Sequence, residues 1–423
     1  MKRILVISWF FPPVNSSEGL VTYKLLRKSK YEYDVFTQKK VDLWSYGNKD
    51  YLPEAENVKS ILSNADNLKD WENDAVEYYK KNINKYDIVM TRSMPPESHK
   101  IGLKIKKINP KVKWIASFGD PIADNPYTEL KIREGAYNPF ALRNYYRLKL
   151  RNVISPRRIY KNILFKIRYK KFHYRSFHNE EVLQKKILNA ADYYIFNSCY
   201  QRDFMLGKDR KKYKGESMII NHSFAEDLYP LNQKKEHRKL IMTYVGHLDD
   251  LRSPRLLFKA LSELLKEDSN LNEKIEVRFY GNMDSKDKVY IIDNELTDIV
   301  KVKKSVSYLE SLKIMQESDW LIHFDANLTS VLDTNIFFAA KLADYIGSNS
   351  QIFAITMQNG ISADILQNMN SLMVTYSVQE IKNYLWLMIY QNYKSEINEE
   401  YRNNFNSEYV AKSFDNTIDR ILK

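Results

Sequence analysis

The amino-acid sequence predicts an α/β protein built from two doubly wound, Rossmann-like domains that face each other across a cleft. Short apolar segments alternate with segments of helical period through the first half of the chain. A polar stretch over Pro230–Lys239 interrupts this alternation, which restarts at Leu240. Strands that alternate with helices form parallel sheets covered on both faces. Because such sheets bind ligands beyond the carboxyl ends of their strands, we expect one shared site between the two halves.

Apolar segments predict the strands of the first domain, which we place at residues 1–229. They are Ile4–Trp9, Tyr33–Thr37, Tyr86–Ser93, Lys113–Asp120, Ala191–Ser198 and Met218–Ser223. The spacing of apolar residues predicts a helix over Ser98–Ile108 and another that contains Val21–Leu26. The first strand is expected to end at Pro12-Pro13, because proline has no N–H group for a β-ladder.

The same pattern predicts a second domain at residues 230–405. Its expected strands are Leu240–Leu248, Ile275–Asn282, the end of "SLKIMQESDWLIHF" and Gln351–Thr356. Its expected helices include Pro254–Leu265 and the segment "AAKLADYIG". Residues 406–423 are expected to form a C-terminal helix that packs back on the first domain.

Composition limits the class of protein. Cys199 is the one cysteine, so the chain forms no internal disulfide and carries no cysteine-rich metal site. The apolar run at Ile4–Phe11 is too short to span a bilayer, and we find no run of about 18 apolar residues elsewhere. These features predict a soluble or peripheral protein of a reducing compartment. A net charge of +13 predicts an acidic partner: nucleic acid, anionic lipid or a phosphorylated substrate.

Much of this charge lies in the segment Gly135–Asn179, which contains no Asp or Glu. Its basic residues alternate with aromatic ones, and four apolar side chains share one helical face: Tyr160, Ile163, Leu164 and Ile167. A basic amphipathic helix of this kind fits an anionic membrane surface. The same composition also fits single-stranded nucleic acid or a solvated helix packed on the domain, and we favour the membrane.

Five segments, in this order, resemble those of one enzyme family. They are "ISWFFPPVNSSEG", "RSMPPESHKIGLKIKK", "WIASFGDPIADNPY", "YVGHLDDLRSPRLLFKAL" and "AAKLADYIGSNSQIFAI". In this respect the chain resembles a GT-B glycosyltransferase, closest to glycosyltransferase family 4 of the bacterial surface-polysaccharide type. The resemblance covers nearly the whole chain. It implies a nucleotide sugar held by the C-terminal domain and retention of anomeric configuration.

The resemblance assigns the first loop to the donor phosphates and the acceptor. A small residue such as Gly19 lets the backbone approach a ligand closely, and the helix that follows offers N–H groups to an anion. An ordinary βα turn explains the same residues. The chain departs from the family's glycine pair, and Glu18 is expected to meet either an acceptor hydroxyl or a basic side chain.

A nucleotide-sugar donor needs cationic groups, because negative charge grows on the leaving phosphate. We find no convincing Asp-x-Asp pair for a metal, so arginine or lysine is expected to supply the charge. Gly246 permits close approach of a ligand after a strand, and Arg252 matches the family's phosphate-binding arginine by position. Arg252 and Arg255 are alternatively solvated surface charges.

The helix "AAKLADYIG" resembles the nucleotide-binding helix of the family. The family's second glutamate, which binds the ribose hydroxyls, corresponds to Asp344, and the first corresponds to Ile336. The backbone N–H groups of Phe338, Ala339 and Ala340 are candidates for the distal phosphate. Lys341 lies in the same turn and reaches either a phosphate or the neighbourhood of Asp344.

Further candidates lie at strand ends and in the acceptor domain. His99 is in the region of a family histidine that contacts the donor sugar, and a packed or surface histidine is the alternative. Asp120 either contacts the acceptor or braces its loop, and Gly119 stands where the related motif has arginine. His222 and His247 each end a strand and are candidates for lining the cleft.

We therefore predict a metal-independent, retaining glycosyltransferase of the hexosyltransferase class, with a nucleotide sugar as co-substrate and no other cofactor. Its acceptor is expected to be a lipid-linked or saccharide glycan of capsule, O-antigen or lipopolysaccharide synthesis. The expected location is cytoplasmic, peripheral on the inner face of the cell membrane, with no nucleic-acid partner. A second interpretation is a nucleotide-sugar epimerase or phosphorylase of the same fold. A third is a non-catalytic protein that binds anionic membranes or nucleic acid and whose donor site has decayed.

Overall fold

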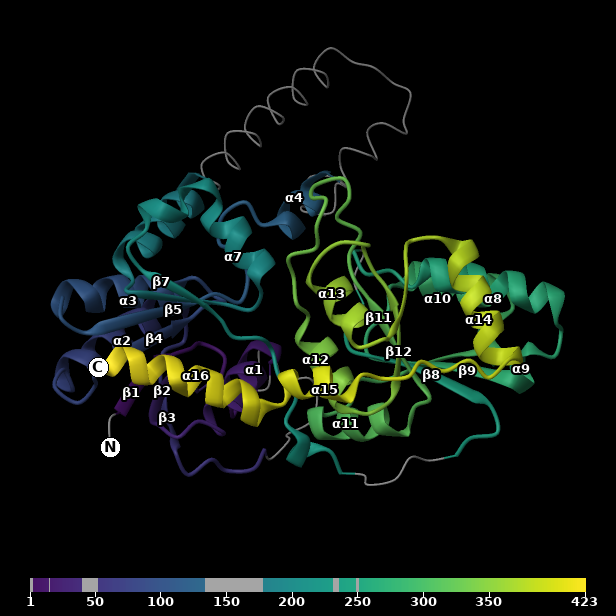
Figure 1. Cartoon of the computed structure of the whole chain (residues 1–423), viewed down its shortest axis with the longest axis horizontal. Coiled ribbons are helices and arrows are strands. Elements are labelled where there is room, and N and C mark those ends of the chain that lie inside the picture. The colour runs from purple at the N-terminus through teal and green to yellow at the C-terminus, as the bar shows by residue number, and fades with distance from the viewer. Residues whose placement is uncertain (1–2, 15, 40–51, 134–177, 231–235, 249–250) are drawn as a thin grey trace, which may run out of the picture.

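The computed structural model describes residues 3–14, 16–39, 52–133, 178–230, 236–248 and 251–423. Two α/β halves lie side by side, the N-terminal one coloured purple to teal and the C-terminal one green to yellow (Figure 1). The basic segment at residues 135–179 lies outside the described residues, apart from its last two residues.

The first sheet has seven strands in the order β3-β2-β1-β4-β5-β6-β7. Every neighbouring pair is parallel. The strands are β1 (Arg3–Ile7), β2 (Glu32–Gln38), β3 (Val58–Ser63), β4 (Ile88–Arg92), β5 (Lys113–Ser117), β6 (Tyr193–Phe196) and β7 (Glu216–Ile219). The order reverses between β1 and β4, which is the point where doubly wound sheets place their ligands.

The second sheet has six strands in the order β10-β9-β8-β11-β12-β13, and these pairs are also parallel. The strands are β8 (Leu240–Val245), β9 (Ile275–Tyr280), β10 (Val300–Lys303), β11 (Trp320–Phe324), β12 (Gln351–Ile355) and β13 (Leu372–Val374). The predicted α/β class with two parallel Rossmann-like sheets is confirmed.

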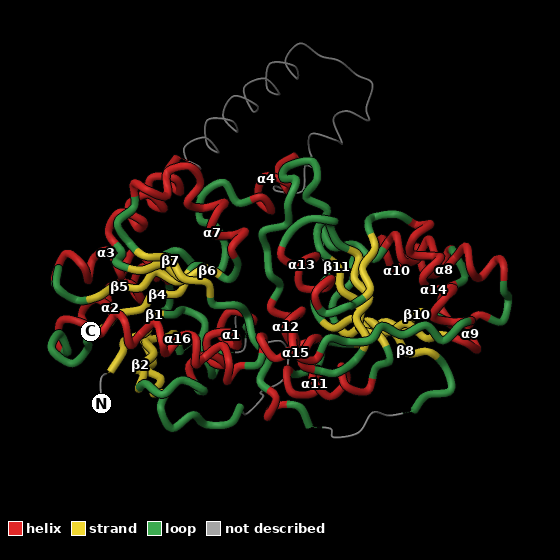
Figure 2. Tube along the Cα trace, viewed as in Figure 1, coloured by secondary structure: helices red, strands yellow, loops and turns green. Residues whose placement is uncertain are grey.

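Helices cover both faces of each sheet (Figure 2). Those of the N-terminal half are α1 (Ser17–Leu26), α2 (Leu68–Lys81), α3 (Glu97–Ile108), α4 (Pro126–Arg133) and α7 (Cys199–Leu206), and residues 178–190 are also helical. Those that follow are α8 (Arg255–Glu267), α9 (Leu271–Lys274), α10 (Ser285–Asp293), α11 (Tyr308–Glu317), α12 (Ala340–Gly347), α13 (Ile361–Asn368), α14 (Val378–Tyr390), α15 (Glu399–Arg402) and α16 (Ser407–Leu422). Short 3₁₀ turns lie at Gly207–Lys212, Glu226–Leu228, Leu296–Asp298 and Asn403–Phe405.

Strand β1 illustrates why the sequence forms a sheet between two helical layers. Its side chains alternate between the faces of the sheet. Ile4 and Val6 belong to the buried cluster that contains side chains of α1 and α16. Leu5 and Ile7 belong to the cluster that contains side chains of α2 and α3. A strand buried on both faces reads as a continuous apolar run, which is the pattern of the sequence here.

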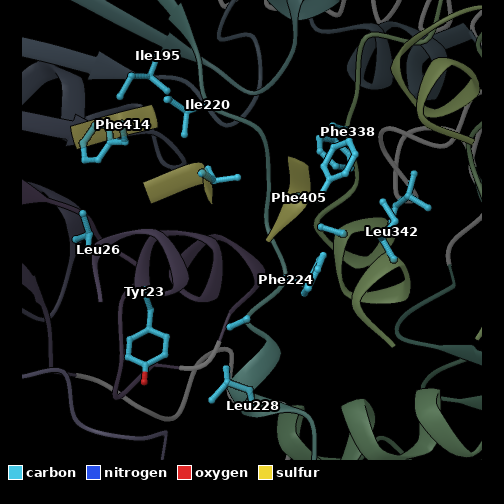
Figure 3. Close-up of a cluster of buried hydrophobic side chains, with 14 of the residues drawn as sticks. Tyr23, Leu26, Ile195, Ile220, Phe224, Leu228, Phe338, Leu342, Phe405 and Phe414 are labelled. Atoms are coloured by element: carbon cyan, nitrogen blue, oxygen red, sulfur yellow. The ribbon is translucent and has the colours of Figure 1, made fainter. Parts of the chain in front are cut away.

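One buried cluster joins the two halves (Figure 3). It contains Tyr23 and Leu26 of α1, Leu342 of α12 and Phe414 of α16. The chain returns to the N-terminal half through α16, which lies beside α1 (Figure 1). Among the described residues, no helix has both the length and the apolar character needed to cross a bilayer.

Candidate active site in the interdomain cleft

A cavity of about 370 Å³ lies where the carboxyl edges of the two sheets meet. The N-terminal half contributes α1 and the residues that follow β5, β6 and β7. The C-terminal half contributes the residues that follow β8, β9 and β10, together with the start of α12. The site therefore lies at the end of the strands where α/β sheets bind ligands.

Gly246 directly follows β8 and lets a lysine pass close to the backbone. Its φ is +129°, a conformation that side chains disfavour, and a Cβ here would lie 2.6 Å from Nζ of Lys341. The Lys341 ammonium lies 3.8 Å from the centroid of the Tyr244 ring. The glycine therefore makes room for a cation at the floor of the cleft.

Helix α12 points its N-terminus into the cavity. Ala339 and Ala340 line the cavity, and no side chain caps the helix at Ala339. The first N–H groups of a helix lack intrahelical partners and carry partial positive charge, which suits an anion. One turn further along, Asp344 also lines the cavity and is only 6% exposed.

Arg252 follows β8 and reaches the opposite half of the molecule. Its guanidinium donates a hydrogen bond of 3.2 Å to the hydroxyl of Tyr127 in α4 and lies 5.4 Å from the centroid of that ring. Tyr127 in turn stacks on Phe337, with ring centroids 4.0 Å apart. Arg252 is thus oriented by both halves of the cleft.

Glu18 meets a basic side chain, which is one of the two partners expected from the sequence. Its carboxylate accepts a hydrogen bond of 3.0 Å from Nε of Arg92, at the end of β4. A Cβ at Gly119 would lie 2.9 Å from both Glu18 carboxylate oxygens. The glycine at this position therefore provides the space that the Glu18 side chain fills.

Asp120 lies beside this ion pair and lines the cavity. Burial raises the pKa of its carboxyl to about 6, and the Glu18 carboxylate adds to the shift. Arg252 and Arg92 act in the opposite direction on this pKa. The carboxyl consequently titrates near pH 6 on the N-terminal side of the cavity.

Comparisons with known proteins identify the fold. No protein-family model and no curated protein matches the sequence. Among solved structures, sucrose-phosphate synthase from Thermosynechococcus elongatus aligns over 100% of this chain and 99% of its own, with 14% identity and a TM-score of 0.64. The trehalose-6-phosphate protein from E. coli bound with UDP-2-fluoro glucose aligns over 100% and 99%, with 11% identity and a TM-score of 0.59. The lipopolysaccharide outer core galactosyltransferase WaaB aligns over 99% of both chains, with 11% identity and a TM-score of 0.57. The chain has the GT-B glycosyltransferase fold.

The GT-B cleft brings together most of the residues that the sequence singles out. Its lining includes Asp120, Gly246, Arg252, Ala339, Ala340, Lys341 and Asp344. The candidates His222 and His247 also line it. Within the described residues, no group of three or more His, Cys, Asp or Glu side chains could hold a metal ion.

Two predicted residues lie away from the cavity. Gly19 is not part of its lining, and a Cβ at this position would lie 3.2 Å from the backbone of Phe10 and Phe11. This glycine lets α1 pack against the preceding loop.

His99 is fully buried behind β4. Its Nδ1 lies 2.7 Å from Oγ1 of Thr91, and its ring packs on Phe118 with centroids 4.8 Å apart. Burial lowers the pKa of His99 to about 3, so the imidazole is neutral at physiological pH. This is the environment of a packed histidine.

The sequence interpretation overlooked several residues that build the site. Lys24 of α1 forms an ion pair with Asp344, and Tyr308 of α11 donates a hydrogen bond to the same carboxylate. Arg92, the partner of Glu18, is another such residue. Lys24 and Arg92 could have been identified from the sequence, because each is a charged residue inside an apolar segment, "VTYKLL" and "IVMTR". A charged side chain in such a segment is buried only when it has a partner of opposite charge.

Proposed function

We propose that this protein is a glycosyltransferase that transfers a sugar from a nucleotide-sugar donor to an acceptor held in the opposite half of the cleft. The observation that carries the proposal is the convergence of Arg252, Lys341 and the uncapped start of α12 on one cavity between two Rossmann-like domains. Two cations and a helix N-terminus form a site for a diphosphate.

The donor half supplies stabilisation of the leaving group. As the glycosidic bond breaks, negative charge grows on the distal phosphate, and Arg252, Lys341 and the N–H groups of Ala339 and Ala340 stabilise it. The Asp344 carboxylate accepts hydrogen bonds from the ribose. These protein cations take the place of a metal ion in this scheme.

The acceptor half supplies the carboxyl of Asp120. With a pKa raised to about 6, it is largely ionised at pH 7.5 and accepts a hydrogen bond from an acceptor hydroxyl. The Glu18–Arg92 ion pair lies beside this carboxyl.

We further propose a lipid-linked glycan of bacterial surface polysaccharide as the acceptor, transfer with retention of configuration, and a peripheral location on the cytoplasmic face of the membrane. The net charge of +13 and the acid-free basic segment at residues 135–179 support a membrane surface. The structural similarity to WaaB, which is named for lipopolysaccharide outer core, is consistent with this acceptor class.

The first experiment is thermal stabilisation by a panel of nucleoside diphosphates and nucleotide sugars without added metal. UDP is tested first, because a structural neighbour contains UDP-2-fluoro glucose. A ligand at about 100 times its dissociation constant adds about 2.7 kcal/mol to the free energy of unfolding. We expect one base to stabilise the protein clearly, and Arg252→Ala to lose the effect.

The matched control is Arg255→Ala, because Arg255 pairs with Asp287 at 2.6 Å and does not line the cavity. Tyr127→Phe tests whether loss of the Arg252–Tyr127 hydrogen bond alone explains the result. Stabilisation by none of the nucleotides contradicts the proposal. Turnover of a nucleotide sugar without a saccharide acceptor would instead support an epimerase.

A further inference from the structure

Lys24 is a fully buried lysine whose partner lies in the other half of the molecule. It belongs to α1, its side chain is 1% exposed, and its ammonium donates a hydrogen bond of 2.7 Å to Oδ1 of Asp344 in α12. The two residues are 320 positions apart in the sequence. The ion pair therefore crosses the cleft.

The same carboxylate oxygen has a second donor. The hydroxyl of Tyr308 donates a hydrogen bond of 3.0 Å to Oδ1 of Asp344, and the Lys24 ammonium lies 5.8 Å from the centroid of the Tyr308 ring. Within the part of the chain that the structure describes, no protein group donates a hydrogen bond to Oδ2 of Asp344. One oxygen is fully engaged by the protein, and the other is open to a ligand hydroxyl.

The negative charge of Asp344 is balanced by a residue of the other half of the molecule. A carboxylate that is as buried as Asp344 requires a counter-charge, and removal of one partner from a buried ion pair is strongly unfavourable. Here the counter-charge comes from the acceptor half. The ion pair that balances the charge of Asp344 therefore forms only when α1 approaches α12.

We propose that Lys24 is a positioning residue for the nucleotide: it orients the Asp344 carboxylate so that Oδ2 accepts a hydrogen bond from a ribose hydroxyl. Closure of the cleft and recognition of ribose are then thermodynamically linked, since one ion pair serves both. This inference rests on the proposed function, because it assumes that a nucleotide occupies the cleft.

The test compares two ligands in titration calorimetry: the nucleoside diphosphate that stabilises the protein most, starting with UDP, and its 2′,3′-dideoxy form. A hydrogen bond to a charged group is worth about 1.5–3 kcal/mol, so we expect the unchanged protein to prefer the ribose form at least about tenfold. Lys24→Met should reduce this ratio of dissociation constants to about 1. Asp344→Asn and the double variant Lys24→Met/Asp344→Asn should give the same ratio, because the two residues act as one unit.

Lys28→Met is the matched control, because Lys28 pairs with Asp227 and Glu408 outside the cavity and should leave the ratio unchanged. If Lys24→Met does not fold, Tyr308→Phe removes the other donor to Oδ1 and should lower the same ratio.

A ratio that is unchanged in Lys24→Met, or tighter binding of the ribose form by that variant, overturns the inference alone, since the lysine would then be structural or a competitor of the ribose. If the unchanged protein binds no nucleoside diphosphate, the proposed function falls and this inference falls with it.

Discussion

At the scale of single residues, Asp120 and Asp325 show how neighbouring side chains set the pKa of a carboxyl that is shielded from solvent. Burial raises the pKa of both groups. At Asp120 the nearby Glu18 carboxylate adds to that rise, and the pKa reaches about 6. At Asp325, burial is outweighed by the electrostatic interaction with His323 and by the hydrogen bonds with His323 and Thr356, which together lower the pKa to about 2. Only the first carboxyl titrates near neutral pH.

Asp120→Asn should therefore stabilise the protein at neutral pH. A carboxyl with an ordinary pKa of 3.8 and a folded-state pKa of about 6 contributes stability at low pH that is lost as the pH rises through about 6. We expect the variant to be more stable than the unchanged protein at pH 7.5, by on the order of 2 kcal/mol, and by clearly less at pH 4.5, because the difference builds between the ordinary pKa of 3.8 and the folded-state pKa of about 6. Urea denaturation at both pH values measures this difference.

Asp124→Asn is the control for this experiment, because Asp124 is exposed in the same loop and asparagine tolerates its φ of +52°. An equal loss of stability at both pH values in Asp120→Asn would show that the carboxyl braces its loop instead. Under the proposed function, the variant also loses sugar transfer.

At the scale of elements, the contact between the end of β8 and the start of α12 explains why residue 246 is a glycine. The sequence suggested only that Gly246 lets a ligand come close to the backbone. Gly246 directly follows the strand with a φ of +129°, and the side chain of Lys341, from the first turn of the helix, occupies the space that a Cβ at Gly246 would need. Two segments that are 95 positions apart by residue number share this contact. The glycine thus sets the position of a cation in the cleft.

Gly246→Ala should displace Lys341 and weaken nucleoside diphosphate binding about tenfold, a loss comparable with that of one charge-assisted hydrogen bond. Backbone strain at a positive φ should also lower the free energy of unfolding by about 1 kcal/mol. Gly207→Ala is the control, because Gly207 has a φ of +50° but a Cβ there would meet no atom within 4 Å. Calorimetry and urea denaturation separate the two effects, and equal nucleotide affinity in both variants would contradict the prediction.

Strands that are buried on both faces of a sheet can be located from the sequence. The segments at β1, β4, β8 and β12 are near-continuous apolar runs, and their predicted bounds differ from the observed ones by a few residues. The strands that were missed, β3, β10 and β13, are edge strands of three to six residues. Residues of β3 and β10 are exposed, so the charged residues there hide the strand pattern.

At the scale of the whole molecule, α16 ties the two halves together. It begins beside Phe224, whose backbone nitrogen donates to the carbonyl oxygen of Phe405. It then lies against α1, where the carboxylate of Asp415 accepts a hydrogen bond of 2.9 Å from the backbone nitrogen of Lys30. Arg402, just before it, donates to the carbonyl oxygens at the end of α12. The last residues of the chain therefore contact both α1 and the helix that carries Asp344.

The charge of the whole chain predicts binding to acidic membranes. We expect the protein to float with phosphatidylglycerol vesicles at low salt, and to be released at about 0.5 M NaCl, where charges are screened within a few ångströms. The pair Arg157→Glu and Arg158→Glu should weaken this binding. The pair Lys286→Glu and Lys288→Glu, at exposed positions of α10, makes the same change of charge and should have less effect. Absence of binding at low salt would remove the membrane from the proposal.

The layers of this protein follow from its sequence alone, because apolar runs and helical spacing are patterns of residues that lie close together along the chain. It also indicated the residues that end strands at the cleft, such as Gly246 and Asp120, since parallel strands bring their carboxyl ends to one edge.

Which charged side chains pair with one another depends on the tertiary structure. The partners Lys24 and Asp344 belong to different halves, as do Arg252 and Tyr127, and no spacing in the sequence relates them. The same holds for His99 and Gly19, whose surroundings come from elements that pack on them. Pairing across a cleft depends on how two domains face each other, and local sequence patterns do not encode that arrangement.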